Sequence, residues 1–316
     1  MQTSFFAEAI LKDRVAFITG GGTGITGGVA RALAEAGAHV ALVSRRLEHL
    51  EPAAKAINDA RSVRSPTVRE GNSEDRATRD VRAGMPALQP TVREGNLGQR
   101  ATRDVRAGTP ALQSTIGEAI AVAADVRNPE EIEKAIAATV ARFGKLDIVV
   151  NGAAGNFLCA AEELSPNGFG TVVDIDLKGT FNVCRAAFDE LKKNRGQILN
   201  ISATLHYVGT PMQLHVSAAK AGVDALTRNL AVEWGRYGIR TNAIAPGPIE
   251  DTEGMKRLIP EAIKEKLRKR IPLGRFGLVK DIENAAVFLC SDAASFINGE
   301  VLVVDGGQWM AGNRLA

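Results

Sequence analysis

The sequence lacks the long apolar runs and the cysteine patterns that define several protein classes. No run of about eighteen apolar residues occurs, so we expect no membrane-spanning helix. The N-terminal segment MQTSFFAEAILKDR has no basic stretch ahead of an apolar one, which argues against a signal peptide. Cys159, Cys184 and Cys290 lack metal or disulfide spacing, and we expect buried thiols in a reducing compartment. The ending Asn-Arg-Leu-Ala is not a peroxisomal Ser-Lys-Leu tripeptide. We therefore expect a cytoplasmic protein without a metal site.

The overall composition is that of a globular protein, and its excess of basic residues is confined to one segment. The chain has 316 residues, of which 45% are hydrophobic and 24% charged, enough for a large core. Its net charge is +3, but residues 61–116 hold ten arginines and six acids, so this segment carries +4 and the rest −1. The segment has no aromatic residue, and we predict no binding to nucleic acid.

The same basic segment contains a tandem repeat. Residues 66–89 and 90–113 agree at 20 of 24 positions. Two copies are too few for a solenoid, and neither has a sustained helical or strand period. We interpret residues 61–116 as a flexible surface insertion between a helix over residues 47–60 and a strand over 119–124. That position is at the end of the sheet opposite the one where ligands bind.

Outside the insertion, short β-branched segments alternate with helical ones, as in a parallel sheet covered on both faces. The expected strands are Val15–Thr19, Val40–Ser44, Ala119–Ala124, Leu146–Val150, Gln197–Ser202, Arg240–Ala245 and Val301–Val304. The sequence therefore predicts a single α/β domain of the Rossmann type, doubly wound around a seven-stranded parallel sheet, with the strand after the insertion at one edge.

A glycine-rich turn, TGGGTGIT over residues 19–26, follows the first expected strand and opens a helix. Such a turn lets the backbone approach a pyrophosphate, which the free N–H groups of the helix stabilise. Thr26 departs from the pattern, because the third glycine position normally allows close packing of helix on strand. We expect Gly27 and Gly28 to let the backbone shift there. The residues assigned to the cofactor are Gly20, Gly22, Thr23, Gly24 and Ile25; a turn without a ligand is the alternative.

The end of the second expected strand bears on the choice of cofactor. An NAD enzyme places an acid there to hold the ribose hydroxyl, whereas this chain has Ser44-Arg45-Arg46. A guanidinium pairs well with a 2′-phosphate, so Arg45 and Arg46 favour NADPH. Two solvated surface arginines are the alternative.

These motifs, together with NGAAG at 151–155, SAAK ending at Lys220 and PGPI at 246–249, resemble the short-chain dehydrogenase/reductase family. The resemblance covers the chain except about residues 61–116. It implies that Asp125 and Val126 contact the adenine, that Asn151 and Ala153 form a shelf for ribose and nicotinamide, and that Lys220, Pro246, Gly247 and Ile249 complete the cofactor site. Two departures affect the chemistry. Val216 stands where the family has its tyrosine acid, and Ala203 stands where it has a serine.

One branch of the family is similar at these points too, the peroxisomal-type 2,4-dienoyl-CoA reductases and their bacterial relatives. Its likeness extends to NGAAGNFLC at 151–159, DIDLKGTFNV at 174–183, NISATL at 200–205 and PGPI-x-x-TEG at 246–254. The resemblance implies NADPH-dependent reduction of a dienoyl-CoA to a 3-enoyl-CoA in unsaturated fatty acid β-oxidation, with hydride added to the δ-carbon and a proton to the α-carbon. We expect Asp176 and Lys220 to be catalytic. The expected substrate contacts are Asn156, Phe157, Thr204, His215 and Ser217.

Two further expectations come from the resemblance. Residues 251–276 match a mobile lid over the substrate, whose basic side chains could meet CoA phosphates; these are Lys256, Arg257, Lys266, Arg268, Lys269 and Arg270. The last strand and its turn imply a homotetramer. Two other functions stay open: a 3-oxoacyl thioester reductase with Tyr207 or His215 as its acid, and a non-catalytic NADPH-binding protein.

Overall fold

Seven parallel strands form one sheet in the computed structural model, which describes residues 9–64 and 116–311. The strand order is β3-β2-β1-β4-β5-β6-β7. The strands are β1 (Val15–Thr19), β2 (His39–Ser44), β3 (Ala119–Ala123), β4 (Ile148–Asn151), β5 (Gln197–Ile201), β6 (Arg240–Pro246) and β7 (Val301–Val304). The predicted fold class and strand number are confirmed, and β3 lies at an edge as expected. The tandem repeat lies outside the described residues.

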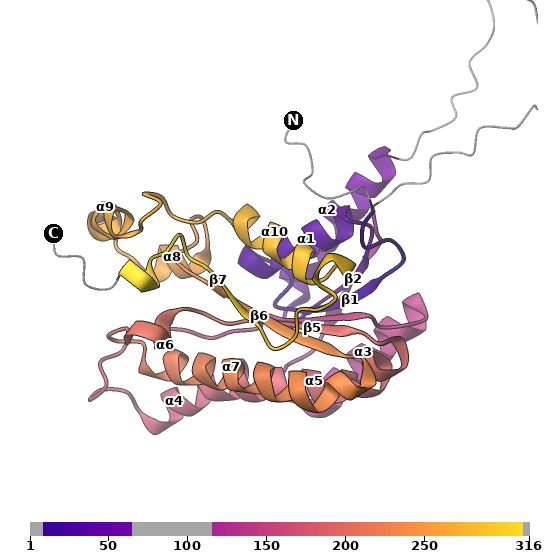
Figure 1. Cartoon of the computed structure of the whole chain (residues 1–316), viewed down its shortest axis with the longest axis horizontal. Helices are drawn as coiled ribbons and strands as arrows, with labels where there is room; N and C mark the ends of the chain where they lie inside the picture. Colours follow the sequence, from indigo (N-terminus) through magenta and orange to yellow (C-terminus); the bar gives the residue numbers. More distant parts are fainter. Residues whose placement is uncertain (1–8, 65–115, 312–316) are drawn as a thin grey trace, which may run out of the picture. The chain divides into compact units, whose positions relative to one another are not determined.

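Helices cover both faces of this sheet (Figure 1). One face carries α1 (Gly24–Glu35), α2 (Leu47–Arg64) and α10 (Val279–Leu289), and the other carries α3 (Pro129–Phe143), α4 (Pro166–Val173), α5 (Gly179–Asn194) and α7 (Leu214–Trp234). Shorter elements are the π-helix η1 (Asp174–Lys178), α6 (Leu205–Val208), α8 (Glu253–Leu258) and α9 (Glu261–Arg270). Helix α2 continues to Arg64 rather than ending at Ala60 as predicted.

Alternating strand residues supply two separate cores, because successive side chains of a strand point to opposite faces. Ala16 and Ile18 of β1 pack into the layer of α1, α2 and α10, whereas Phe17 packs into the layer of α3, α5 and α7. All three side chains are fully buried. Burial on both faces explains why these strands are almost continuously apolar in sequence.

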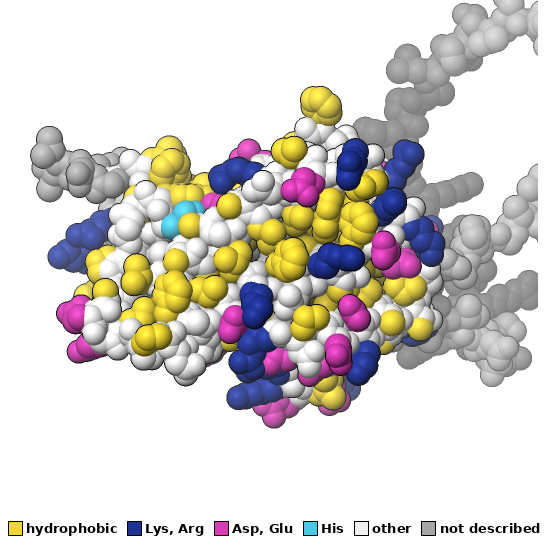
Figure 2. Space-filling view, turned by 90° about the horizontal axis from the view of Figure 1, so that it is seen from below, with side chains coloured by type: hydrophobic (Ala, Val, Ile, Leu, Met, Phe, Trp, Pro, Cys, Tyr) yellow, Lys and Arg dark blue, Asp and Glu magenta, His cyan; other side chains and the backbone are white. Residues whose placement is uncertain are grey.

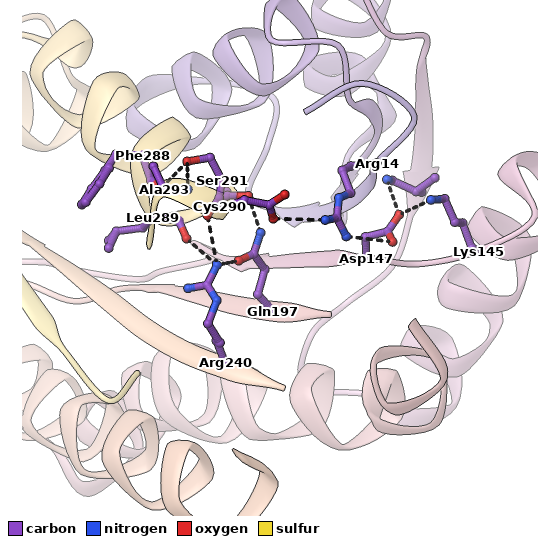
Figure 3. A network of polar contacts seen from close by, with 12 residues as sticks. Arg14, Lys145, Asp147, Gln197, Arg240, Phe288, Leu289, Cys290, Ser291 and Ala293 are labelled. Atoms are coloured by element: carbon purple, nitrogen blue, oxygen red, sulfur yellow. Dashed lines mark hydrogen bonds and ion pairs between the residues drawn. The ribbon is translucent and has the colours of Figure 1, made fainter. Parts of the chain in front are cut away.

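A polar network joins the starts of several strands (Figure 3). Arg240, the first residue of β6, donates to Gln197, the first residue of β5, and to the carbonyls of Leu289 (3.0 Å) and Ser291 (3.4 Å). Gln197 donates in turn to the carbonyl of Cys290. These contacts satisfy carbonyls at the C-terminal end of α10, which have no partner within the helix. The network ties α10 to the sheet.

The same end of the sheet is where the chain leaves and re-enters the described fold. Asp147, just before β4, accepts from the backbone N–H of Val15 (2.8 Å) and lies 3.2 Å from Lys145 Nζ. Helix α2 ends at Arg64, and the described chain resumes at Ile116, just before β3. The C-terminal ends of the strands are left for the candidate site.

Candidate active site

The glycine-rich turn between β1 and α1 has the geometry of a phosphate cradle. Gly20 (φ +72°) and Gly24 (φ +58°) adopt left-handed backbone conformations that favour glycine. A Cβ on Gly20 would lie 2.8 Å from the Gly152 carbonyl oxygen, and one on Gly22 would lie 2.7 Å from the His49 carbonyl oxygen. Helix α1 begins at Gly24 with Thr23 as its N-cap, so its first N–H groups can bind an anion. The residues fit a nicotinamide dinucleotide.

Thr26 is accommodated by a neighbouring loop. Its hydroxyl donates to the Gly20 carbonyl (2.6 Å), and a Cβ placed on Gly152 would lie only 2.0 Å from its Cγ2. Gly28 faces α10 instead, where a Cβ would lie 2.2 Å from Val279 Cγ1. The expectation that Gly27 and Gly28 make room for Thr26 is therefore corrected, because the missing side chain of Gly152 makes that room.

Charged residues follow β2 and β3, the two strands whose ends were expected to contact the adenosine part of the cofactor. Arg45 and Arg46 are exposed just after β2, with Arg46 3.6 Å from Glu48. Asp125, after β3, accepts from Arg127 through both carboxylate oxygens, and this hydrogen bonding lowers the pKa of Asp125. The structure leaves both strand-end arginines accessible to a ligand.

Thr19 of β1 holds the loop that follows β4, where the shelf for ribose and nicotinamide was expected. Its hydroxyl accepts from the backbone N–H groups of Gly152 (3.1 Å) and Ala153 (3.2 Å). The Asn151 side chain turns into the protein, where its amide donates to Asn200 Oδ1 (2.9 Å). Asn151 therefore supports the shelf from within.

The loop after β6 lies close against β7. The Gly247 N–H donates to the Val304 carbonyl (3.0 Å), and a Cβ on Gly247 would lie 2.6 Å from Asp305 Cβ. Ile249 is buried and forms an isolated bridge with Gly277. Pro246 ends β6, so this loop is held on both sides.

A buried ion pair joins Asp176 and Lys220, and Lys220 lies four residues after Val216, the position where the family has its tyrosine. Asp176 has no exposed surface and lies in η1, a wide helical turn of the kind often found at functional sites. Its Oδ1 accepts from the Gly155 N–H (2.7 Å), and its Oδ2 lies 3.2 Å from Lys220 Nζ. Lys220 donates to the Ile201 carbonyl (2.9 Å). Val216 is a buried apolar side chain and can donate no proton.

Several residues expected to contact the substrate have unpaired polar atoms. Among the described residues, buried atoms without a hydrogen-bond partner include Asn156 Oδ1, Asp176 Oδ2, both ring nitrogens of His215 and Ser217 Oγ. Asp176 Oδ2 is close to Lys220, but the two do not form a well-directed hydrogen bond. The ring of Phe157 packs on His215 at 4.2 Å. Polar groups left free in this way suit a polar ligand.

Thr204 is buried at the start of α6, and its carbonyl accepts from the Tyr207 N–H (3.1 Å). In the same loop, Ser202 and Tyr207 donate to the buried carboxylate of Asp224 at 2.5 and 2.9 Å, and His206 Nε2 lies 2.8 Å from it. Asp224 was missed in the sequence, although it lies four residues after Lys220, on the same side of α7.

The Asp224 cluster decides the role of Tyr207. Burial raises the pKa of the Tyr207 phenol, and the charge of Asp224 raises it further. A phenol whose proton is held by a carboxylate is a poor acid. Tyr207 is therefore unsuited to replace the tyrosine that position 216 lacks.

The predicted lid contacts the substrate loop through one of its basic residues. Arg257 of α8 donates to the Asn156 carbonyl, and Asn156 donates to Gln213 Oε1 (2.8 Å). Lys256, Arg268 and Lys269 pair locally with glutamates, as Arg268 does with Glu265 (2.8 Å). Such exposed pairs add little stability, which leaves these side chains available to a ligand.

No metal cluster or membrane helix stands out in the part of the chain that the structure describes. Residues 9–64 and 116–311 contain no group of three or more His, Cys, Asp or Glu side chains placed to hold a metal ion. Over the same ranges, none of the helices is both long and apolar enough to cross a bilayer.

Comparisons with known proteins identify the family of the chain. Residues 98–308 match the family model described as enoyl-(acyl carrier protein) reductase, and residues 14–89 match the short chain dehydrogenase model. The chain is 42% identical over 303 residues to a peroxisomal 2,4-dienoyl-CoA reductase of Saccharomyces cerevisiae, covering 96% of this chain and 86% of that protein. It is 41% identical over 319 residues to the Arabidopsis thaliana protein of that name, covering 98% and 89%.

A solved structure is similar as well. The gluconate 5-dehydrogenase of Burkholderia cenocepacia in complex with NADP and tartrate is 28% identical, with a TM-score of 0.72 over 94% of this chain and 95% of that one. Its fold binds a nicotinamide cofactor, in agreement with the cradle described above.

The relatives correct one expectation. Both are named peroxisomal, which points to the peroxisome, so the expectation of a cytoplasmic enzyme is wrong. That expectation depended on missing targeting signals and on the cysteine pattern, and a peroxisomal signal is read by a receptor and leaves no mark on the fold. The family-model matches, the fold and the glycine-rich turn all lead to the same conclusion. The chain belongs to the short-chain dehydrogenase/reductase family and is an oxidoreductase that binds a nicotinamide cofactor.

Proposed function

We propose that the protein reduces 2,4-dienoyl-CoA thioesters to 3-enoyl-CoA with NADPH, in the β-oxidation of unsaturated fatty acids. The names of the two relatives support the substrate class. The observation that carries the proposal is the buried Asp176–Lys220 pair beside Val216. It provides an acid and base system where a ketone-reducing relative would have a phenol.

The arrangement of residues suits reduction of a conjugated thioester. When bound, the cofactor would supply the hydride. Its addition to the δ-carbon would place negative charge on the thioester oxygen, as a dienolate. The proton reaches the α-carbon afterwards, at a distance from that oxygen. Asp176 is held by Gly155 and Lys220, and its Oδ2 has capacity to hold a water molecule for this delivery. The proton passes from Asp176 through this water to the α-carbon, and Lys220 stabilises the carboxylate that remains.

Preference for NADPH follows from the end of β2. Arg45 and Arg46 are both exposed there, and no acid occupies the position that would hold a ribose hydroxyl. The charge of Arg45 also acts on Asp125, so the arginine lies on the side of the site where the adenosine ribose is expected. A guanidinium can bind a 2′-phosphate with two parallel hydrogen bonds.

Turnover of 2,4-hexadienoyl-CoA tests the function. The full-length protein is mixed with NADPH and either 2,4-hexadienoyl-CoA, acetoacetyl-CoA or no acyl-CoA, and loss of the reduced nicotinamide is followed by absorbance. We expect consumption with the dienoyl thioester alone, and losses of kcat of about 10²–10⁴ in Asp176→Asn and Lys220→Ala. Consumption with acetoacetyl-CoA alone would replace the proposal with a ketoreductase. Near-normal rates in both variants would rule out the mechanism.

We further propose that residues 251–276 close over the CoA. The contact between Arg257 and the Asn156 carbonyl supports this, because it joins α8 to a loop that also carries the candidate substrate residue Phe157. Thr252 caps α8 by accepting from the Met255 N–H (3.2 Å), which fixes where the helix begins.

Assembly as a homotetramer is the remaining proposal. Phe181 of α5 is 48% exposed and Val232 of α7 is 82% exposed, although both are large and apolar. Hydrophobic side chains gather on the face seen from below, the side of α4, α5 and α7 (Figure 2). Exposed apolar patches of this kind commonly mark subunit contacts. Light scattering during size-exclusion chromatography measures the mass directly, and a monomer would contradict the proposal.

A further inference from the structure

A buried histidine without hydrogen-bond partners lies near the candidate catalytic pair. His215 is in the first turn of α7 and has no exposed surface, and neither of its ring nitrogens has a partner among the described residues. A neutral imidazole carries one N–H donor and one acceptor. Leaving both unpaired in the interior is unfavourable, and buried polar groups are nearly always paired. The imidazole is therefore placed to bind a group from outside the chain.

The surroundings of His215 place that group in the substrate site. The ring of Phe157 packs on the imidazole with centroids 4.2 Å apart and planes tilted by 48°. The charge of Asp176 also acts on it. An aromatic ring, a carboxylate and an unpaired imidazole together suit a conjugated chain that ends in a polar group.

The protonation state limits what His215 can do. Burial lowers the pKa of its imidazole, an effect only partly opposed by the charge of Asp176. The ring is therefore neutral under physiological conditions. A neutral imidazole is a weak acid but a good hydrogen-bond donor, and other enzymes use one to polarise a carbonyl. His215 can therefore stabilise charge without losing its proton.

We propose that His215 donates a hydrogen bond to the thioester carbonyl oxygen of the acyl-CoA and is the oxyanion-stabilising residue of this site. This inference rests on the proposed function. When hydride forms the new C–H bond at the δ-carbon, the double bonds shift toward the thioester and the electron pair settles on the carbonyl oxygen. The N–H of His215 meets that charge, and no bond to nitrogen breaks. Re-forming the carbonyl then takes up the proton at the α-carbon from the Asp176 side.

Substitution of the imidazole separates this role from a structural one. His215→Leu removes unpaired polar atoms from the interior, so we expect a Tm equal to or above that of the wild type. We expect its kcat with 2,4-hexadienoyl-CoA to fall by about 10²–10³, the usual effect of removing an oxyanion donor. His215→Gln keeps an N–H donor and should retain more activity. His39→Gln, at the opposite end of the sheet, is the matched control and should leave kcat unchanged.

A spectroscopic measurement tests the contact without turnover. Hexanoyl-CoA labelled with carbon-13 at the thioester carbonyl is bound to the full-length protein with NADP⁺, and its carbonyl stretch is measured by infrared difference spectroscopy. We expect a lower frequency in the wild type than in solution, and loss of that shift in His215→Leu. An unchanged shift, or a kcat for His215→Leu close to the wild-type value, would overturn the inference.

The two proposals fail in different ways. If the wild type does not reduce 2,4-hexadienoyl-CoA but the carbonyl shift depends on His215, the proposed reaction is wrong and the thioester contact stands. If the wild type reduces the dienoyl thioester and His215→Leu does so equally well, the reaction stands and the role of His215 is wrong. A combined loss of kcat and Tm in both His215 variants would indicate a structural role and also overturn the inference.

Discussion

Replacing Gly152 by alanine tests the fit between the glycine-rich turn and the loop after β4. The new Cβ would lie 2.0 Å from Thr26 Cγ2, far inside the distance of about 3.5–4.0 Å at which carbon atoms normally touch. Overpacking of this kind costs about 1–3 kcal/mol. Each kcal/mol lowers Tm by about 2–4 °C in a domain of this size class. We therefore expect Gly152→Ala to lower Tm by about 2–12 °C.

The substitution Thr26→Ser isolates the cause. It removes the methyl group that would clash and keeps the hydroxyl that donates to the Gly20 carbonyl. The nearest remaining neighbours of a Cβ on residue 152 are then the Thr19 carbonyl oxygen and Thr26 Cβ, both at 3.2 Å. Small shifts relieve such contacts, so Gly152→Ala should cost less than about 1 kcal/mol in the Thr26→Ser background. Contacting residues commonly show coupling of about 0.5–3 kcal/mol.

Thermal unfolding of the wild type, both single variants and the double variant measures this coupling, and titration with NADPH shows whether the cradle survives. Gly170→Ala is a matched control, because nothing lies within 4 Å of a Cβ there, and it should leave Tm unchanged or raise it. Equal losses from Gly152→Ala in the two backgrounds would refute the reasoning, since the Thr26 methyl could then not be the obstacle.

Three other predictions concern the rest of the molecule. Arg240→Leu removes charged hydrogen bonds worth about 1.5–3 kcal/mol and should lower Tm without changing the Kd for NADPH; an unchanged Tm would contradict the role of the network. Tyr207→Phe should keep most of the kcat for 2,4-hexadienoyl-CoA, because its phenol is held by Asp224, and a loss like that of Asp176→Asn would make it the acid instead. Arg257→Ala should raise the KM for the acyl-CoA about 3–10-fold, given one exposed charged hydrogen bond, and steady-state kinetics showing an unchanged KM would argue against the lid contact.

Much of the fold could be predicted because it depends on local patterns. Apolar runs bounded by turn residues gave all seven strands, and their ends differ by at most a few positions from the structure. Leu146 was assigned to β4 but lies before it, because a buried apolar residue next to a strand reads like part of the strand. The chain order of strands and helices then left few possible topologies.

The site was predictable only where one motif contains both partners or where the family resemblance supplied them. Asp176 and Lys220 were both expected from the family resemblance, and the structure places their charged groups 3.2 Å apart. The fit of Thr26 to Gly152 could not be read from either segment, because it links residues far apart in the sequence. The spacing of four residues from Lys220 could have predicted that Asp224 lies on the same side of α7. Its three partners, however, come from the segment after β5.

The polar network at the strand starts has a practical consequence for engineering. Arg240 and Gln197 hold α10 against one end of the sheet, whereas Lys220, the partner of Asp176, donates to the carbonyl of Ile201 at the other end. Substitutions that raise heat resistance can be sought at the first end with little risk to catalysis.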